Sequence, residues 1–100
     1  MPEHPLSLFE KLDPELLAHV QRMDEFVFAS GALPRKTKLL IAMAFDAAHG
    51  AVNGVRALAS AAMKEGATPA EIAEVLRVAC HLAGVGAFYT AATGLREVIP

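Results

Sequence analysis

The chain has 100 residues, of which 54% are hydrophobic and 20% are charged, and its formal net charge is −2. This length corresponds to one small domain, 1–100, and the high apolar content excludes a disordered chain. Because neither sign of charge dominates, nucleic acid and anionic membranes are not expected as partners. The single cysteine excludes an internal disulfide framework and fits a reducing compartment.

The sequence shows no targeting or membrane signal. The first ten residues hold two prolines and no basic segment followed by an apolar run, so we expect no signal peptide. The longest apolar stretch, Leu39 to Phe45, is far shorter than the roughly 20 residues that a membrane helix needs. We therefore expect a cytoplasmic protein. Its apolar surplus exceeds what one small core can hide, which predicts a homo-oligomer.

The first strong helix signal is Asp13 followed by Pro14, an N-cap residue before a proline at the first helical position. Gly31 is expected to end this helix in the left-handed conformation. The apolar residues that recur between them at helical spacing are Leu16, Leu17, Val20, Met23 and Val27.

Pro34 begins a second helix, in which residues 39–48 are apolar on every side except at Asp46. Such a helix is expected to be buried all round, between other helices and a second subunit. His49 and Gly50 interrupt it. A third helix is predicted from about Ala51 to Glu65.

The segment 68–71, Thr-Pro-Ala-Glu, is a capping box and starts a fourth helix, which Gly84 and Gly86 are expected to break. A last helix follows, and no stretch alternates with the period of a strand. The fold class is therefore predicted to be all-α, a compact bundle of five to six short helices. The side chains expected to face inward on the last two helices are Ile72, Val75, Leu76, Ala79, Ala83, Phe88, Ala91, Ala92, Leu95 and Val98.

A group of polar residues at the end of the apolar helix is the strongest candidate for chemistry. His49 lies three residues after Asp46, a helical-neighbour spacing, and Asn53 follows four residues later. A carboxylate that holds an imidazole fixes its tautomer and raises its basicity, so the group is a candidate catalytic acid–base centre. The alternative is that these side chains only satisfy backbone groups at helix ends.

Two other polar features have simpler interpretations. Cys80 and His81 are adjacent on a helix and point about 100° apart, so they do not form a nucleophile–base pair. Arg35, Lys36 and Lys38 lie near a helix start, where the dipole disfavours cations, which indicates either an anionic partner or a solvated flank. No metal-ligand spacing or phosphate-binding loop is present, so we expect no metal and no cofactor.

Three segments resemble a known family. They are LPRKTKLLIA at 33–42, GATPAEIAEVL at 66–76 and AGVGA at 83–87. Together they resemble the carboxymuconolactone decarboxylase family, which includes the alkylhydroperoxidase D-like proteins. The resemblance covers residues 33–95, and residues 1–32 form a less family-like N-terminal helical region. It implies an all-α homo-oligomer, a trimer or hexamer, with sites near subunit contacts.

Redox members of that family carry a C-x-x-C motif, a histidine four residues after it and a glutamate twelve residues before it. The resemblance places these positions at Ala51, Gly54, Leu58 and Leu39, all of them apolar. Thiol redox chemistry needs an attacking thiolate and a resolving thiol, so peroxidase and disulfide reductase activities are not expected. The decarboxylase branch keeps a histidine where this chain has Leu58.

Three hypotheses remain. The first is a homo-oligomeric scaffold without redox chemistry, which either binds a small organic acid or apolar ligand or serves in assembly. The second is a cofactor-free enzyme that uses Asp46 and His49 as acid and base on a lactone or carboxylate substrate. The third is a residual peroxidase or thiol function through Cys80, paired between subunits.

Overall fold

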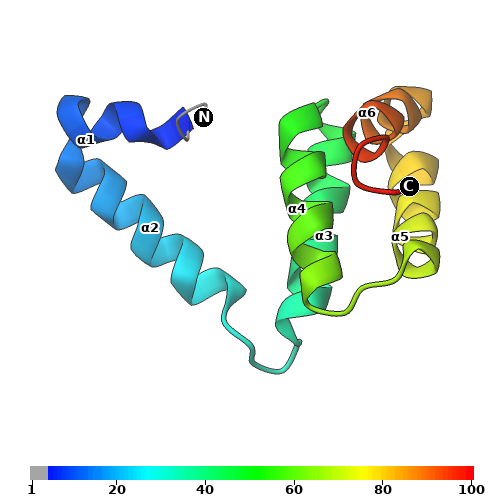
Figure 1. Ribbon diagram of the computed structural model, residues 1–100, viewed down its shortest axis with the longest axis horizontal. Coiled ribbons are helices and arrows are strands. Elements are labelled where there is room, and N and C mark those ends of the chain that lie inside the picture. The colour runs from blue at the N-terminus through cyan, green and yellow to red at the C-terminus, as the bar shows by residue number, and fades with distance from the viewer. Residues whose placement is uncertain (1–4) are drawn as a thin grey trace.

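Helices form in every segment for which the sequence predicts them. The computed structural model describes residues 5–100, and within that range it contains six α-helices, one 3-10 turn and no strand (Figure 1). The all-α class is therefore confirmed. The elements are η1 (Pro5–Leu8), α1 (Phe9–Leu12), α2 (Pro14–Phe28), α3 (Arg35–Ala48), α4 (Val52–Lys64), α5 (Pro69–Ala83) and α6 (Val85–Leu95).

The helix starts follow from their capping residues. The Oδ1 atom of Asp13 accepts a hydrogen bond from the backbone N–H of Leu16 at 3.0 Å, and Pro14 occupies the first turn of α2. At α5 the hydroxyl of Thr68 accepts from the Glu71 N–H at 3.1 Å, and the Glu71 carboxylate accepts from the Thr68 N–H at 2.9 Å. Each cap satisfies N–H groups that have no partner inside the helix.

Two of the helix ends require glycine. Gly50 and Gly66 adopt φ angles of +76° and +98°. Each lies two residues after the last residue of its helix, α3 or α4, and the chain reverses direction there. The next N–H after each glycine bonds back into the helix, from Ala51 to the Asp46 carbonyl at 2.8 Å and from Ala67 to the Ala62 carbonyl at 2.9 Å. This is the Schellman arrangement, which lets α3, α4 and α5 fold back on one another.

Two predicted helix breaks were wrong. Gly31 does not adopt a positive φ, and α2 ends earlier, at Phe28, with Ala29 already extended. Gly86 lies inside α6, so Gly84 alone, with a φ of +96°, separates α5 from α6.

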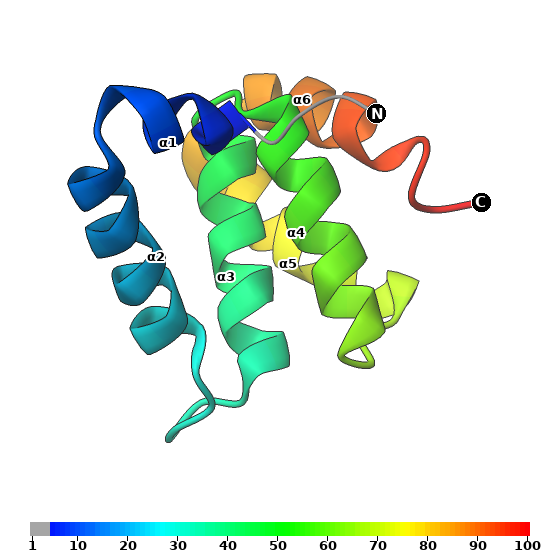
Figure 2. The same cartoon turned by 60° about the vertical axis from the view of Figure 1, so that its left-hand side comes forward.

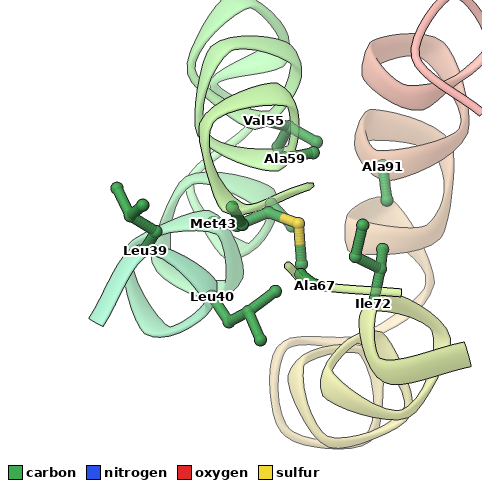
Figure 3. Close-up of a cluster of buried hydrophobic side chains, with 10 residues drawn as sticks. Leu39, Leu40, Met43, Val55, Ala59, Ala67, Ile72 and Ala91 are labelled. Carbon is green, nitrogen blue, oxygen red and sulfur yellow. The ribbon is translucent and has the colours of Figure 1, made fainter. Parts of the chain in front are cut away.

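Helices α3 to α6 form the body of the protein, and the core lies between them (Figure 3). Met43 of α3 is fully buried at its centre, as are Val55 and Ala59 of α4. Many of the contacts involve alanine, which lets the helices approach closely. The buried residues of this cluster are Leu39, Leu40, Met43, Ala47, Val55, Ala59, Ala62, Ala67, Ile72 and Ala91.

The segment 5–28, which comprises η1, α1 and α2, is called the N-terminal arm. None of its residues is buried, and α2 diverges from α3 after the connecting loop (Figure 1). A second view shows that the arm runs beside α3, on the side away from α5 (Figure 2). The radius of gyration is 14.3 Å, whereas a compact domain of this length has about 13 Å.

Some residues predicted to face inward are exposed in the single chain. Helix α3 is not buried all round, because Ile41 and Phe45 are 43% and 62% exposed. Ala83 at the end of α5 is exposed, and so are Ala92 and Phe88 on α6, the latter at 58%. The α3 residues lie on the side of their helix opposite the core, where only a second subunit could cover them, so that part of the expectation stays a prediction.

Over residues 5–100 no helix is both long and apolar enough to cross a bilayer. Of the ten residues from which we expect no signal peptide, Met1, Pro2, Glu3 and His4 lie outside the described range.

Candidate functional site

The turn between α3 and α4 carries the three predicted site residues. Asp46 lies in the last turn of α3, His49 caps that helix, and Asn53 lies in the first turn of α4. The His49 N–H bonds to the Phe45 carbonyl at 3.0 Å, which fixes the backbone of the turn. The Schellman reversal at Gly50 thus brings the end of one helix next to the start of the other.

The Asp46 side chain is half-buried and packs against the backbone of Gly54 in α4. A β-carbon at position 54 would overlap the carboxylate, since it would lie only 2.7 Å from the Asp46 Cγ. The carboxylate therefore occupies the space that any other residue at position 54 would fill. Sequence reasoning did not find this contact, although an isolated glycine inside a helical pattern is a signal for close packing.

His49 and Asn53 point to other partners. The His49 ring is exposed and lies 6.3 Å from the Phe45 ring, centroid to centroid, with the planes tilted by 45°. The Asn53 Oδ1 accepts a hydrogen bond from Arg56 Nη1 at 2.9 Å. Within residues 5–100 no hydrogen bond joins the side chains of Asp46, His49 and Asn53 to one another. The geometry therefore offers a half-buried carboxylate and a solvent-facing imidazole on one turn, without a preformed relay between them.

Two of the positions that the resemblance assigns to the redox groups lie at this turn, and the other two lie farther along α3 and α4. Ala51 is the N-cap residue of α4, and Gly54 lies beneath Asp46. Leu58 packs against the core cluster and Leu39 is 3% exposed within it. Thus none of the four positions carries a thiol or a proton-transfer group, and the Asp46 carboxylate packs against one of them, Gly54.

Cys80 lies elsewhere, in α5, and is 3% exposed. His81 next to it is exposed, near the C-terminal end of the helix, where a basic side chain interacts favourably with the last carbonyl groups. A thiol must be accessible to react, and Cys80 is buried in the single chain.

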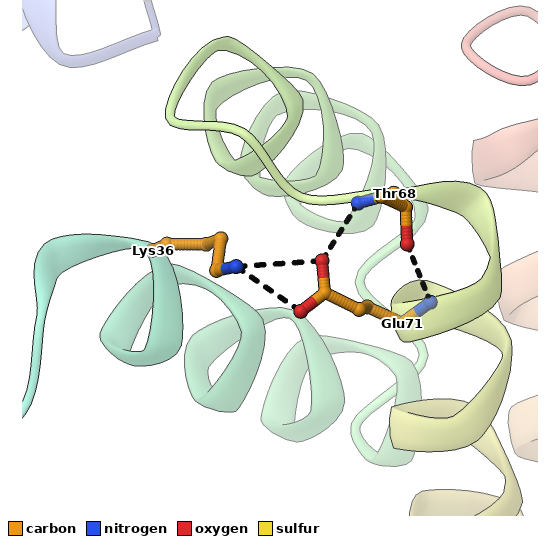
Figure 4. A network of polar contacts seen from close by, with 3 residues as sticks. All are labelled: Lys36, Thr68 and Glu71. Carbon is orange, nitrogen blue, oxygen red and sulfur yellow. Dashed lines mark hydrogen bonds and ion pairs between the residues drawn. The ribbon is translucent and has the colours of Figure 1, made fainter.

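The three cations at the start of α3 bind groups of the same chain. Arg35 Nε pairs with Glu65 Oε1 at 3.2 Å, and Lys38 Nζ donates to the Ala29 carbonyl at 2.6 Å. Lys36 Nζ lies 3.1 Å from the Glu71 Oε2, so it joins the start of α3 to the capping box of α5 (Figure 4). The predicted acidic partner is thus supplied at least in part from within the chain.

Glu71 provides the one clear expectation for pH dependence. Its hydrogen bond from the Thr68 N–H, followed by the Lys36 ammonium, lowers the pKa of the Glu71 carboxyl below its ordinary 4.5. A group with a lowered folded pKa stabilises the native state above its unfolded pKa, and this contribution disappears as the pH falls through the folded value.

We therefore expect Glu71→Gln to unfold at lower urea concentration than the unmodified chain at neutral pH, and the gap to narrow well below pH 4.5. Urea titrations across that range check this expectation. If the difference in urea midpoint between the two proteins stayed constant with pH, the charge of Glu71 would not contribute to the stability of the fold.

The described residues contain no group of three or more His, Cys, Asp or Glu side chains placed to hold a metal ion together. An open groove of about 530 Å³ lies within the N-terminal arm, between its first turns and α2. Three acidic side chains line it, those of Glu10, Asp24 and Glu25. It is separate from the α3–α4 turn.

Comparisons with known proteins identify a family with the same helical fold. The sequence model of the carboxymuconolactone decarboxylase family matches residues 14–97. The chain also resembles the crystal structure of apo-lpg0406, a carboxymuconolactone decarboxylase family protein from Legionella pneumophila. The two are 32% identical with a TM-score of 0.83, over 90% of this chain and 80% of the other. No curated protein matches this chain. From the family match and the shared fold, the chain belongs to the carboxymuconolactone decarboxylase family.

Proposed function

We propose that this protein is a homo-oligomeric assembly scaffold of the carboxymuconolactone decarboxylase family that does not perform the thiol redox chemistry of the family. It would act by forming a multi-subunit structure rather than by turning over a peroxide or disulfide. The proposal combines two features, an unusually large exposed surface and the lack of reactive groups at the positions where redox relatives carry them.

The accessible surface of the single chain carries the proposal. It amounts to 7030 Å², whereas a folded monomer of 10.6 kDa exposes roughly 5,500 Å². The surplus of about 1,500 Å² lies in the range of about 1,000–2,500 Å² that each subunit of an obligate homodimer buries. Between Pro5 and Pro100, fifteen large apolar side chains are exposed, among them Phe26, Leu82 and Tyr89 at 79%, 78% and 73%. Such a surface indicates association.

A redox function has no support from the thiols. Positions 51 and 54 carry alanine and glycine, and the single cysteine of the chain is buried in a different helix. A peroxide-consuming cycle needs two thiols that can meet and exchange a disulfide. The hypothesis of a thiol function through Cys80 therefore requires a partner cysteine from another subunit and exposure of a buried side chain.

Assembly is favoured over the binding of a small organic acid. The groove in the arm has the volume of a ligand site, since such sites occupy about 300–1,000 Å³. Its rim carries three carboxylates, which repel an organic anion. The α3–α4 turn presents a carboxylate as well.

An acid–base enzyme is the second candidate, and the contact between Asp46 and Gly54 favours it. The Asp46 carboxylate is half-buried and makes no hydrogen bond within residues 5–100, so its oxygens are not engaged by the fold. With His49 three residues away, a bound lactone or carboxylic acid could exchange protons with the pair.

One set of assays tests both candidates. Light scattering after gel filtration should give a mass that is a multiple of 10.6 kDa, and the purified protein should consume neither hydroperoxide with a thiol donor nor a panel of lactones. A monomer, or peroxide consumption, would overturn the scaffold proposal. Lactone turnover that His49→Ala abolishes, with the oligomer intact, would establish the enzyme instead.

A further inference from the structure

We propose that the N-terminal arm is exchanged between copies, so that an apolar stripe on α2 packs against the outer face of α3 in a second copy. This inference rests on the proposed homo-oligomer and adds the surface that forms it. The stripe, called the α2 stripe, consists of Leu16, Val20, Met23 and Val27.

The spacing of the α2 stripe is that of a helix-packing seam. Its members follow one another at intervals of four, three and four residues, which keeps them on one side of the helix over three turns. In the single chain they are between 42% and 61% exposed, and α2 has no buried residue at all. A 15-residue helix with a continuous apolar stripe gains most of its stability by packing that stripe. Here only Val20 faces another part of the same chain, the groove within the arm, and every member of the stripe stays exposed.

The outer face of α3 offers a matching surface. Ile41 and Phe45 lie four residues apart, one turn along the side of α3 that faces away from Leu40 and the core. Both are exposed, and Ala48 lies one further turn along, exposed too. No charged side chain interrupts this face between Ile41 and Ala48 apart from the inward-placed Asp46. Two apolar helix surfaces of this length can pack together over several turns.

The loop between α2 and α3 holds the arm away from its own body. Arg35 donates through its backbone N–H to the Ser30 hydroxyl at 3.3 Å and through Nη1 to the Phe28 carbonyl at 3.4 Å. Lys38 binds the Ala29 carbonyl, and the Gly31 N–H bonds to the Leu33 carbonyl at 3.0 Å. These contacts join the end of α2 and the loop to the start of α3, where Figure 1 shows the two helices diverging, so α3 of the same chain does not cover the α2 stripe.

A second copy fits the exposed area better than an unrelated partner. The surplus surface of about 1,500 Å² per chain is what one subunit contributes to a large symmetric interface. If the arm of one copy covers α3 of another in a closed symmetric assembly, every copy both gives an arm and receives one, so both unpartnered faces are buried together. One arrangement thus accounts for the exposed α2 stripe, for Ile41 and Phe45 and for the elongated shape.

The first test places charges on the α2 stripe. Leu16→Glu with Met23→Glu should convert the oligomer to a monomer at a protein concentration at which the unmodified chain is fully associated. Arg22→Glu is the matched control, because it makes the same charge change of −2 next to Met23 on another side of α2, where Arg22 contacts His19 of the same arm. Gel filtration with light scattering gives the mass, and circular dichroism confirms that the helices remain.

The outcomes separate this inference from the proposed function. A monomeric unmodified chain contradicts the homo-oligomer itself. If the unmodified chain is an oligomer and the double variant is the same oligomer, the arm contact alone is overturned. The arm contact is also overturned if Arg22→Glu converts the oligomer to a monomer to the same extent as the double variant.

A second measurement identifies the receiving face and does not depend on losing the oligomer. The variant with Met23→Cys and Phe45→Cys, treated with a short bismaleimide, should give chains joined covalently to one another, whereas the single variants should not pair these positions. A link confined within one chain would mean that the arm folds onto its own α3. Either that result or the lack of a link overturns the inference.

Discussion

Met43→Ala is expected to destabilise the protein strongly, because it removes the side chain at the centre of the core. Met43 is fully buried in α3 and faces both α4 and α5 (Figure 3). Truncation removes its apolar contacts and leaves a cavity among side chains that are already mostly alanine. Such substitutions cost about 2–5 kcal/mol. The whole stability of a small domain is about 5–15 kcal/mol.

The loss should appear as a lower urea midpoint and a lower melting temperature, by about 4–8 °C for each kcal/mol. All samples need the same protomer concentration, because association of the kind proposed above would contribute to the apparent stability. Met43→Leu is the control, since it nearly conserves the volume and should cost less than about 1.5 kcal/mol. Equal effects of the two substitutions would mean that the core can collapse around the vacant space.

Local signals explain why the helices could be predicted from the sequence. The capping box at Thr68 and the cap at Asp13 act within a single turn, so residue identity and spacing are enough to locate them. The turns at Gly50 and Gly66 follow from the one residue type that adopts a positive φ without strain. Gly31 has the same identity and a different conformation, because α2 stops before it reaches that glycine.

Burial was harder to predict, because an interface between copies has the same composition as a core. Ile41 and Phe45 are as apolar as Met43, yet they lie on the other side of α3. Helical periodicity shows that a helix is apolar all round and does not show which side the same chain covers. For the exposed residues of α3, the sequence predicts burial but does not say whether the same chain or a second subunit provides it.

The candidate site was predicted only in part for a similar reason. The spacing of Asp46 and His49 could be read along one helix, whereas the contact of Asp46 with Gly54 crosses a turn and depends on how α3 and α4 meet. The family resemblance identified Gly54 as a position without its thiol. The structure adds that a carboxylate fills the space, so restoring a cysteine there requires Asp46 to move.

Gly94→Ala should destabilise the protein although alanine is the better helix former. Gly94 is buried in α6 where that helix crosses α4, and a β-carbon there would lie 2.9 Å from the Val52 carbonyl oxygen and 3.0 Å from the Val55 side chain. The carbonyl belongs to the backbone of the neighbouring helix, so the two helices must separate. Overpacking of this kind costs about 1–3 kcal/mol, against a gain of at most about 1 kcal/mol in helix propensity.

Gly86→Ala in the same helix is the matched control and should have the opposite sign. Neither glycine has a positive φ, and nothing lies within 4 Å of a β-carbon at Gly86. There alanine should stabilise the chain by about 0.4–1 kcal/mol, chiefly by restricting the unfolded state. Urea unfolding of the two variants measures the difference directly. If both variants gained stability, α6 would be free to shift away from α4, and the close approach at Gly94 would not constrain how α6 packs in the body.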